Sequence, residues 1–206
     1  MTDPTAFDNA SFIPDCAAYP DRWAEAARDY RSVETALGRA RLNESYGSHP
    51  SEKYDLFYPQ SAQTKGTVIF IHGGFWRAFT RTDWSHLAAG CSARGWAVAM
   101  PSYPLCPEVT VSQITASIIS AVNAIALKTR GKIALTGHSA GGHLAAMALS
   151  TDWSALAGDL PAGLLAGGCS ISGVYDLEAV RLSYHNKVLH IAADIKAAAA
   201  DLEEAV

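Results

Sequence analysis

The sequence has few charged residues and no closely spaced pair of cysteines. Charged side chains make up only 17% of its 206 residues, and the formal net charge is −4. So small and negative a charge does not favour nucleic acid or an anionic membrane as a partner. The four cysteines, Cys16, Cys91, Cys106 and Cys169, are widely scattered and form no C-x-x-C pair, which argues against a zinc or redox site. The sequence therefore predicts reduced thiols in a cytoplasmic protein, with no metal and no cofactor.

The sequence also lacks the marks of secretion and of membrane insertion. Residues 1–8 contain neither a basic region nor an apolar run, so they do not read as a signal peptide. The longest apolar stretches are broken by Gly, Ser or Asn before they reach the length of a membrane span, about 20 residues. With 49% hydrophobic residues, the chain is expected to form a single domain, residues 1–206, with a sizeable core.

Apolar patterns along the chain predict alternating strands and helices. Helices are expected at 21–38, 83–93, 111–128 and 141–150, strands at 53–58, 67–71, 96–100, 132–136 and 163–172, and a polar turn at 59–66. This order predicts an α/β fold with a doubly wound, mostly parallel sheet, whose ligands bind beyond the carboxyl ends of the strands. Residues 1–50 are expected to form a helical N-terminal extension, with Trp23 and Tyr30 packed in the core.

One segment, Gly137-His138-Ser139-Ala140-Gly141, has the G-x-S-x-G pattern between a predicted strand and a predicted helix. This strand–turn–helix context is that of the nucleophile elbow, in which a sharp turn exposes the serine hydroxyl. Gly137 and Gly141 would leave room where strand and helix nearly touch, because a Cβ there would clash. The start of the helix would also place the Ala140 N–H near a reacting carbonyl. Ser139 is thus the candidate nucleophile.

A second motif, His72-Gly73-Gly74-Phe75-Trp76, follows the predicted strand 67–71 and lies upstream of the elbow. It matches the H-G-G type of oxyanion loop, whose glycines let backbone N–H groups approach the substrate oxygen. We expect Gly73, Gly74, Phe75 and Ala140 to form an oxyanion hole. His72 is expected to brace the loop rather than to move protons.

These two motifs resemble those of α/β-hydrolases of the arylformamidase (kynurenine formamidase) type, in which the loop reads H-G-G-x-W. Further segments that carry the resemblance lie at 54–59, 103–107 and 171–178. The resemblance implies that Ser139 attacks a small acyl substrate, an aryl formamide such as N-formylkynurenine, and releases formate and an aromatic amine. Phe75, Trp76 and His138 are candidates for the substrate pocket, and packing of Trp76 below the loop is the alternative.

The family's catalytic acid and histidine have no clear counterpart in this sequence. After Tyr184 the chain continues into an alanine-rich, atypical helical tail, residues 185–206, where the family has two further strands. Asp176 with His185 or His190 is a conceivable acid–base pair, since triads are recognised by geometry. His138 and His143 are expected to pack or cap rather than to act as the base.

Three functions stay open on the sequence alone. The first is an arylformamidase-like serine hydrolase, the second a general carboxylesterase, and the third a truncated or otherwise impaired fragment or a non-catalytic binding module. A sheet that ends early would leave an exposed edge, which favours association into a homo-oligomer. No nucleic acid or membrane partner is expected.

Overall fold

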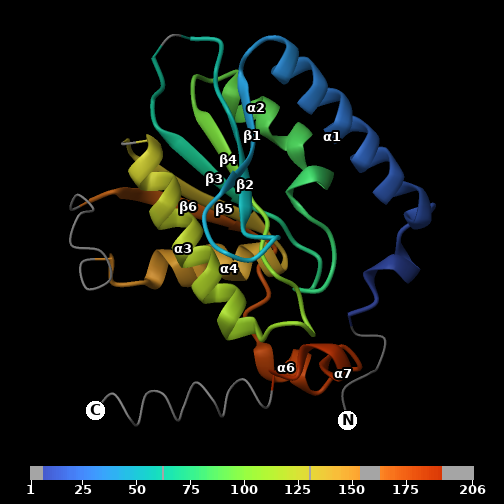
Figure 1. The fold of residues 1–206 in the computed structure, drawn as a ribbon. Coiled ribbons are helices and arrows are strands. Elements are labelled where there is room, and N and C mark those ends of the chain that lie inside the picture. Colours follow the sequence, from blue (N-terminus) through green and yellow to red (C-terminus); the bar gives the residue numbers. More distant parts are fainter. Residues whose placement is uncertain (1–6, 62, 130, 154–162, 192–206) are drawn as a thin grey trace.

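The computed structural model describes residues 7–61, 63–129, 131–153 and 163–191. Its centre is a six-stranded sheet in the order β1-β2-β4-β3-β5-β6 (Figure 1). The strands are β1 (Ala40–Ser45), β2 (Lys53–Phe57), β3 (Thr67–Ile71), β4 (Ala97–Pro101), β5 (Ile133–His138) and β6 (Leu165–Ile171). Strands β4, β3, β5 and β6 are parallel to one another, whereas β1 and β2 pair antiparallel. The predicted doubly wound, mostly parallel sheet is confirmed.

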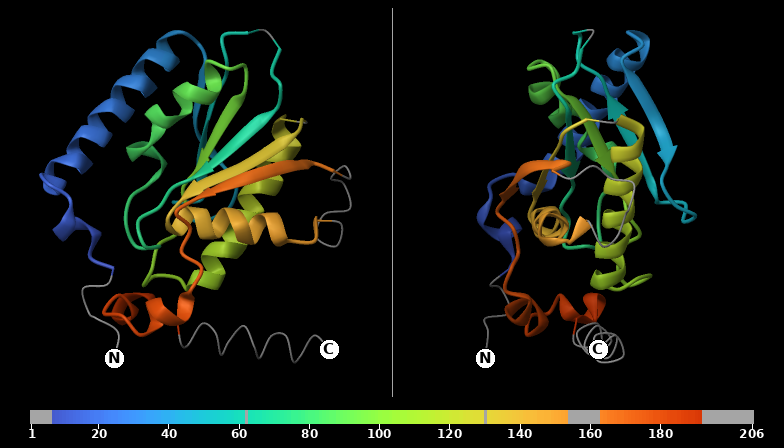
Figure 2. Two further views of the ribbon diagram at one scale, coloured as in Figure 1. Left: turned by 180° about the vertical axis from the view of Figure 1, so that it is seen from behind. Right: turned by 90° about the vertical axis from the view of Figure 1, so that its left-hand side faces the viewer.

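Helices cover both faces of this sheet. The long helix α1 (Tyr19–Ala36) and the short α2 (Ala89–Ser92) lie on one face, and α3 (Val111–Thr129) and α4 (Ala140–Ser150) lie on the other (Figure 2). Two short helices, α6 (Leu177–Arg181) and α7 (Asn186–Leu189), lie beyond the sheet, below α3 and α4 in Figure 1. Because β3, β5 and β6 are parallel, their carboxyl ends meet at one edge of the sheet, where both sequence motifs lie.

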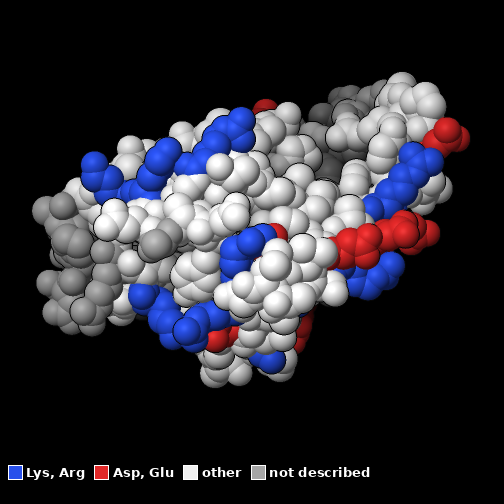
Figure 3. Space-filling view, turned by 90° about the horizontal axis from the view of Figure 1, so that it is seen from above, with Lys and Arg blue, Asp and Glu red and all other residues white. Residues whose placement is uncertain are grey.

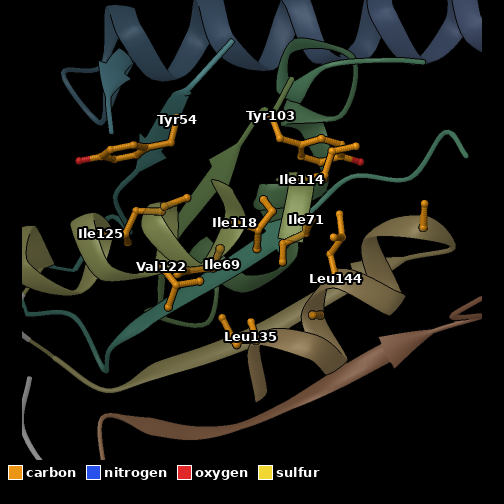
Figure 4. Close-up of a cluster of buried hydrophobic side chains, with 14 of the residues drawn as sticks. Tyr54, Ile69, Ile71, Tyr103, Ile114, Ile118, Val122, Ile125, Leu135 and Leu144 are labelled. Atoms are coloured by element: carbon orange, nitrogen blue, oxygen red, sulfur yellow. The ribbon is translucent and has the colours of Figure 1, made fainter. Parts of the chain in front are cut away.

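The larger core lies between the sheet and the helices α3 and α4. Ile114, Ile118, Val122 and Ile125 recur at helical spacing along α3 and are fully buried. They face apolar side chains of β3 and β5, such as Ile69, Ile71 and Leu135 (Figure 4). By length and composition alone α3 could cross a membrane, but core helices pass the same test, and this stripe packs inside the protein.

The smaller core fills the opposite face of the sheet, beneath α1. Phe57, Val98 and Met100 from β2 and β4 are buried there, and Tyr30 of α1 packs against Phe57 with ring centroids 5.2 Å apart. The prediction that Tyr30 packs in the core agrees with this contact. Gly38 follows α1 with φ of +68°, a conformation that ends helices and that glycine adopts without strain.

The expected helical extension over residues 1–50 is wrong for its last part, because residues 40–45 form the edge strand β1. The segment Ala-Arg-Leu-Asn-Glu-Ser has few strand-favouring residues, so its sequence gives little strand signal. The segment forms a strand because it pairs with β2. Asn43 has a positive φ of 63°, and the register shifts between Arg41 and Glu44, so the strand is also irregular.

Two further expectations need correction or lie outside the described residues. The predicted helix 83–93 is instead a series of short turns: the 3₁₀ helices η3 (Arg81–Asp83) and η4 (Ser85–Ala88), followed by α2. Thr80 caps the first of them in a reciprocal capping box with Asp83, which tightens the chain locally. Of the expected helical tail 185–206, the structure describes α7 and the residues up to 191, and residues 192–206 lie outside it.

Charged side chains of both signs share the face seen from above in Figure 3. Basic and acidic groups lie there with broad uncharged surface between them. The side chains that form ion pairs on or near the surface include Arg39 with Glu34 and Arg181 with Glu178. Glu34 is itself buried, whereas Arg181 and Glu178 form an exposed pair, and exposed pairs contribute little to stability individually.

Candidate active site

The turn between β5 and α4 has the geometry of a nucleophile elbow. Ser139 stands between the last strand residue, His138, and the first helical residue, Ala140, with φ of 56° and ψ of −120°. A positive φ is costly for a non-glycine residue, and such strain clusters at functional sites. The Ser139 N–H donates to the carbonyl of Ile171 in β6 at 2.9 Å, which ties the turn to the neighbouring strand.

Two glycines make this turn possible because strand and helix are almost in contact. A Cβ on Gly137 would lie 2.2 Å from the Gly141 carbonyl oxygen, and one on Gly141 would lie 2.1 Å from the Ile71 oxygen and 2.4 Å from the His72 oxygen. All of these atoms belong to the backbone and cannot move aside easily. The close approach expected from the G-x-S-x-G pattern is therefore present at both positions.

The loop after β3 lies directly against Ser139. A Cβ on Gly73 would be 3.2 Å from the Ser139 Cβ and 2.7 Å from the His138 oxygen. Gly74 has φ of +119°, Phe75 of 49° and Trp76 of 55°, so three consecutive residues have positive φ. Consecutive residues of this kind form a tight turn, and the Gly74 carbonyl accepts the N–H groups of Arg77 and Ala78.

His72 braces this loop, as its position before the glycines predicts. The ring is 1% exposed and stacks on Tyr103 with centroids 4.3 Å apart. Its Nδ1–H donates to the Gly73 carbonyl at 2.8 Å, and the Tyr103 hydroxyl donates to the His72 carbonyl at 2.8 Å. Burial lowers the pKa of His72 to about 4, so the ring is neutral at physiological pH.

A cavity of about 550 Å³ opens in front of Ser139. This volume is within the usual range of small-molecule sites, roughly 300–1,000 Å³. The sheet edge contributes Ser139, His138, Gly73, Gly74 and Phe75 to its wall. The remaining wall comes from the N-terminal segment and from the turns before α2: Asn9, Ala10, Ile13, Cys16, Tyr19, Pro20, Trp23, Phe79 and Trp84.

A second, smaller cavity of about 280 Å³ adjoins the first. The two share Trp23, Trp84, Gly73 and His138. Sequence reasoning placed Trp23 in the core, but the structure places it half-buried in the wall of both cavities. The apolar spacing of residues 21–38 could not show that Trp23 lines a cavity. The apolar side of this helix both packs on the sheet and extends past the edge of the sheet.

Of the residues expected to line the substrate pocket, Phe75 and His138 do so and Trp76 does not. The Trp76 side chain is fully buried in the larger core and contacts His143 edge-on, with centroids 5.4 Å apart. Trp76 therefore supports the loop from below, which is the alternative reading of the motif. His143, also buried, has a lowered pKa because of its burial, and it packs rather than facing the serine.

The suggested pairing of Asp176 with His185 or His190 is not formed. The Asp176 carboxylate accepts the Ala179 N–H at 3.0 Å and caps α6. His190 is exposed beyond the end of α7, whereas His185 is buried and stacks on Phe75 with centroids 4.1 Å apart. In the described part of the chain, no histidine or carboxylate makes a hydrogen bond to the Ser139 hydroxyl, so the described residues include no base in position.

The described residues also include no group of three or more His, Cys, Asp or Glu side chains placed to hold a metal ion. His185 lies near the site all the same: Phe7 contacts both Phe75 and His185 edge-on, and Phe75 separates the His185 ring from the cavity. Burial is the main cause of its lowered pKa.

The elbow, the glycine loop and the doubly wound sheet together define an α/β-hydrolase. Comparison with known families agrees, because residues 54–176, more than half of the chain, match the family model described as BD-FAE. The chain belongs to the BD-FAE family.

Individual relatives show how far the similarity extends. The chain is 32% identical over 170 residues to kynurenine formamidase of Salmo salar, which covers 79% of this chain and 56% of that protein. It is also 32% identical to kynurenine formamidase of Danio rerio, over 80% of this chain and 55% of that protein. A solved structure from Silicibacter sp. TM1040, described as a "putative thioesterase", is 43% identical with a TM-score of 0.83, covering 92% of this chain and 70% of that one. The chain thus spans about half the length of the curated relatives it matches.

Proposed function

We propose that the chain is a serine hydrolase of the arylformamidase type, with Ser139 as the nucleophile and backbone N–H groups as the oxyanion hole. The observation that carries the proposal is the contact between the elbow and the glycine loop at the mouth of the cavity. A Cβ on Gly73 would be only 3.2 Å from that of Ser139, so a carbonyl bonded to the serine would lie within reach of the loop. The N–H of Ala140, in the first turn of α4, has no partner within its own helix and supplies a second donor.

The reaction starts when the Ser139 oxygen attacks the carbonyl carbon of an amide. The carbonyl oxygen becomes an oxyanion that accepts hydrogen bonds from Ala140 and from the 73–75 loop. The bond from carbon to nitrogen then breaks, and the amine leaves with a proton that it takes from water. Water attacks the acyl-serine, releases the acid and restores the hydroxyl.

The group that accepts the serine proton determines the expected rate. No described side chain is placed to take it, so we assign it to water in the first step. Serine hydrolases that lose triad members still keep about 10³–10⁴-fold catalysis over water from the oxyanion hole and binding. The 206-residue chain should accordingly turn over slowly but measurably, and a kcat in the ordinary range of about 1–10³ s⁻¹ would contradict this assignment.

An aryl formamide is the substrate class that we favour. The two fish relatives bear the name kynurenine formamidase, and the cavity wall here is rich in aromatic side chains, among them Phe75, Trp23 and Trp84. The name of the solved relative favours a thioester as an alternative substrate, and the carboxylesterase function left open by the sequence would use an ester. Rates on formanilide, p-nitrophenyl acetate and an acetyl thioester, measured side by side, separate these substrates.

Labelling with a fluorophosphonate probe tests the nucleophile directly, because phosphonylation, like acylation, is helped by an oxyanion hole beside the reacting serine. Ser172 is a matched control: it also follows a strand and has a positive φ of 48°, but it does not line the cavity. We expect the parent and Ser172→Ala chains to be labelled slowly, since no described base takes the Ser139 proton, and Ser139→Ala to stay unlabelled while it remains folded. Equal labelling of Ser139→Ala would contradict the proposal.

A further inference from the structure

The N-terminal end of α1 reaches the proposed catalytic cavity, where it places the indole of Trp23 together with Tyr19 and Pro20. We propose that Trp23, paired with Trp84, is a specificity-determining residue that binds a flat aryl group of the substrate beside Ser139. The inference rests on the proposed function for the position of the reacting carbonyl. It adds a binding site built from an element, α1, that neither sequence motif includes.

The geometry of the aromatic cluster supports this role. The rings of Trp23 and Trp84 lie 4.7 Å apart at 34°, and Phe79 stands edge-on to both, 6.3 Å from Trp23 and 5.4 Å from Trp84. Tyr19 extends the cluster along α1, 5.8 Å from Trp23. These are the offset and edge-to-face arrangements that aromatic rings prefer, so an aryl substrate could join the cluster by similar contacts.

The position of the cluster relative to Ser139 matters as much as its composition. Trp23, Trp84 and Phe79 line the same cavity as Ser139 and Gly73, and Trp23 and Trp84 also line the adjoining smaller one. A carbonyl carbon held at the serine has two substituents. The aromatic wall can receive the larger, flat one, while the small formyl hydrogen of a formamide needs no further room.

A buried ion-pair network holds α1 and its tryptophan in place. Asp55 of β2 is fully buried and pairs with Arg31 of α1, and its other oxygen lies 3.1 Å from Arg81 of η3. The same oxygen accepts the Asn43 N–H at 2.8 Å. Arg31 belongs to α1, which carries Trp23, and Arg81 belongs to η3, which leads into Trp84. Both elements are therefore held by the same carboxylate. A wall fixed in this way favours binding, because little ordering of its side chains is needed.

Binding to the Ser139→Ala chain tests the inference without requiring turnover. Acetanilide and N-cyclohexylacetamide carry the same amide, and their rings differ in flatness and aromatic character. We expect acetanilide to bind about fivefold more tightly in an NMR titration, a preference of the size that aromatic contacts give. Trp23→Leu in the same background should abolish this preference, and Trp23→Phe should keep most of it.

Tyr30→Leu is the control, since Tyr30 lies on α1 but packs on Phe57 away from the cavity. We expect it to leave the preference intact. The inference is overturned if the Ser139→Ala chain shows no preference or no binding, if Trp23→Leu keeps the preference, or if Tyr30→Leu abolishes it as well. Failure of the fluorophosphonate reaction, by contrast, would count against Ser139 as nucleophile and leave this binding result standing.

Discussion

Two turns at the same edge of the sheet follow parallel strands and lead into helices, and each begins with a serine of positive φ. Ser139, after β5, has φ of 56°, and Ser172, after β6, has φ of 48°. After Ser139 the helix begins at once, at Ala140, and glycines let it press on the backbone of β3. After Ser172 the chain runs through three residues without regular structure, 173–175, before the Asp176 side chain caps α6.

This difference separates two ways of placing a functional side chain. In the β5–α4 turn the backbone itself determines where the serine lies, because there is no room for the strand and helix to shift. In the β6–α6 turn the position depends on side chains, and the one carboxylate there already accepts a backbone N–H. The first turn can present a nucleophile, whereas the second holds no acid that is free to orient a histidine.

The largest effect is expected where a glycine of the first turn gains a methyl group. In Gly141→Ala the new Cβ would lie 2.1 Å and 2.4 Å from two backbone oxygens, so β3 and α4 must separate. We expect a loss of at least about 3 kcal/mol in unfolding free energy, the upper end of overpacking costs, or no folded protein at all. Urea denaturation measures it.

Gly173→Ala provides the comparison from the second turn. There the added Cβ would meet the Tyr175 hydroxyl at 2.4 Å and the Ser170 hydroxyl at 2.5 Å, both at the ends of side chains that can rotate. We expect a cost below about 1 kcal/mol, as for surface changes of this kind. Equal losses in the two variants would show that the turns do not differ in the way described here.

The next largest effect concerns the glycine loop that faces the first turn. Gly74→Val should lower kcat by at least about a hundredfold, because a branched side chain at φ of +119° would meet the Ala78 oxygen and displace the N–H donors. Gly38→Val is the control, since Gly38 also has a positive φ but no atom within 4 Å of its Cβ position. If Gly74→Val changed only thermal stability, as we expect of Gly38→Val, the loop would be structural.

A third prediction uses the buried histidine that supports the loop. The folded pKa of His72, about 4, is below its ordinary value of 6.5, so folding favours the neutral ring. Its contribution to stability is complete above pH 6.5 and is lost as the pH falls toward 4. Between pH 7 and pH 5 this amounts to about 2 kcal/mol. Urea unfolding at both pH values should show this loss in the parent and a smaller one in His72→Asn, and equal losses would contradict it.

The parts of the site that could be predicted from sequence are those that the backbone determines. The patterns around Ser139 and Gly73 predicted the elbow, the loop and their order on the sheet, because the close approach of the backbone requires glycines at these positions. The bracing role of His72 followed for the same reason, since it directly precedes the glycines.

The parts that could not be predicted depend on contacts between distant segments. β1 is a strand because β2 pairs with it, not because its residues favour one. Trp23 and Trp76 are both tryptophans beside apolar residues, and only the fold puts the first at the cavity and the second in the core. Asp176 follows a strand, as a catalytic acid would. Its carboxylate, however, accepts the N–H of Ala179 at the start of α6.

The smallest effect is expected at Asp176, and it separates a cap from a catalytic acid. Asp176→Ala should cost about 1 kcal/mol in unfolding free energy, the usual value for losing an N-cap, and should leave kcat unchanged. Asp176→Asn should retain the cap, because an amide oxygen accepts the Ala179 N–H as a carboxylate does. A catalytic acid would behave in the opposite way: its replacement by the neutral amide would lower kcat while stability held. Steady-state kinetics and urea denaturation of both variants therefore decide the role, and a rate lost in Asp176→Asn would place the carboxylate in the reaction despite its contact with α6.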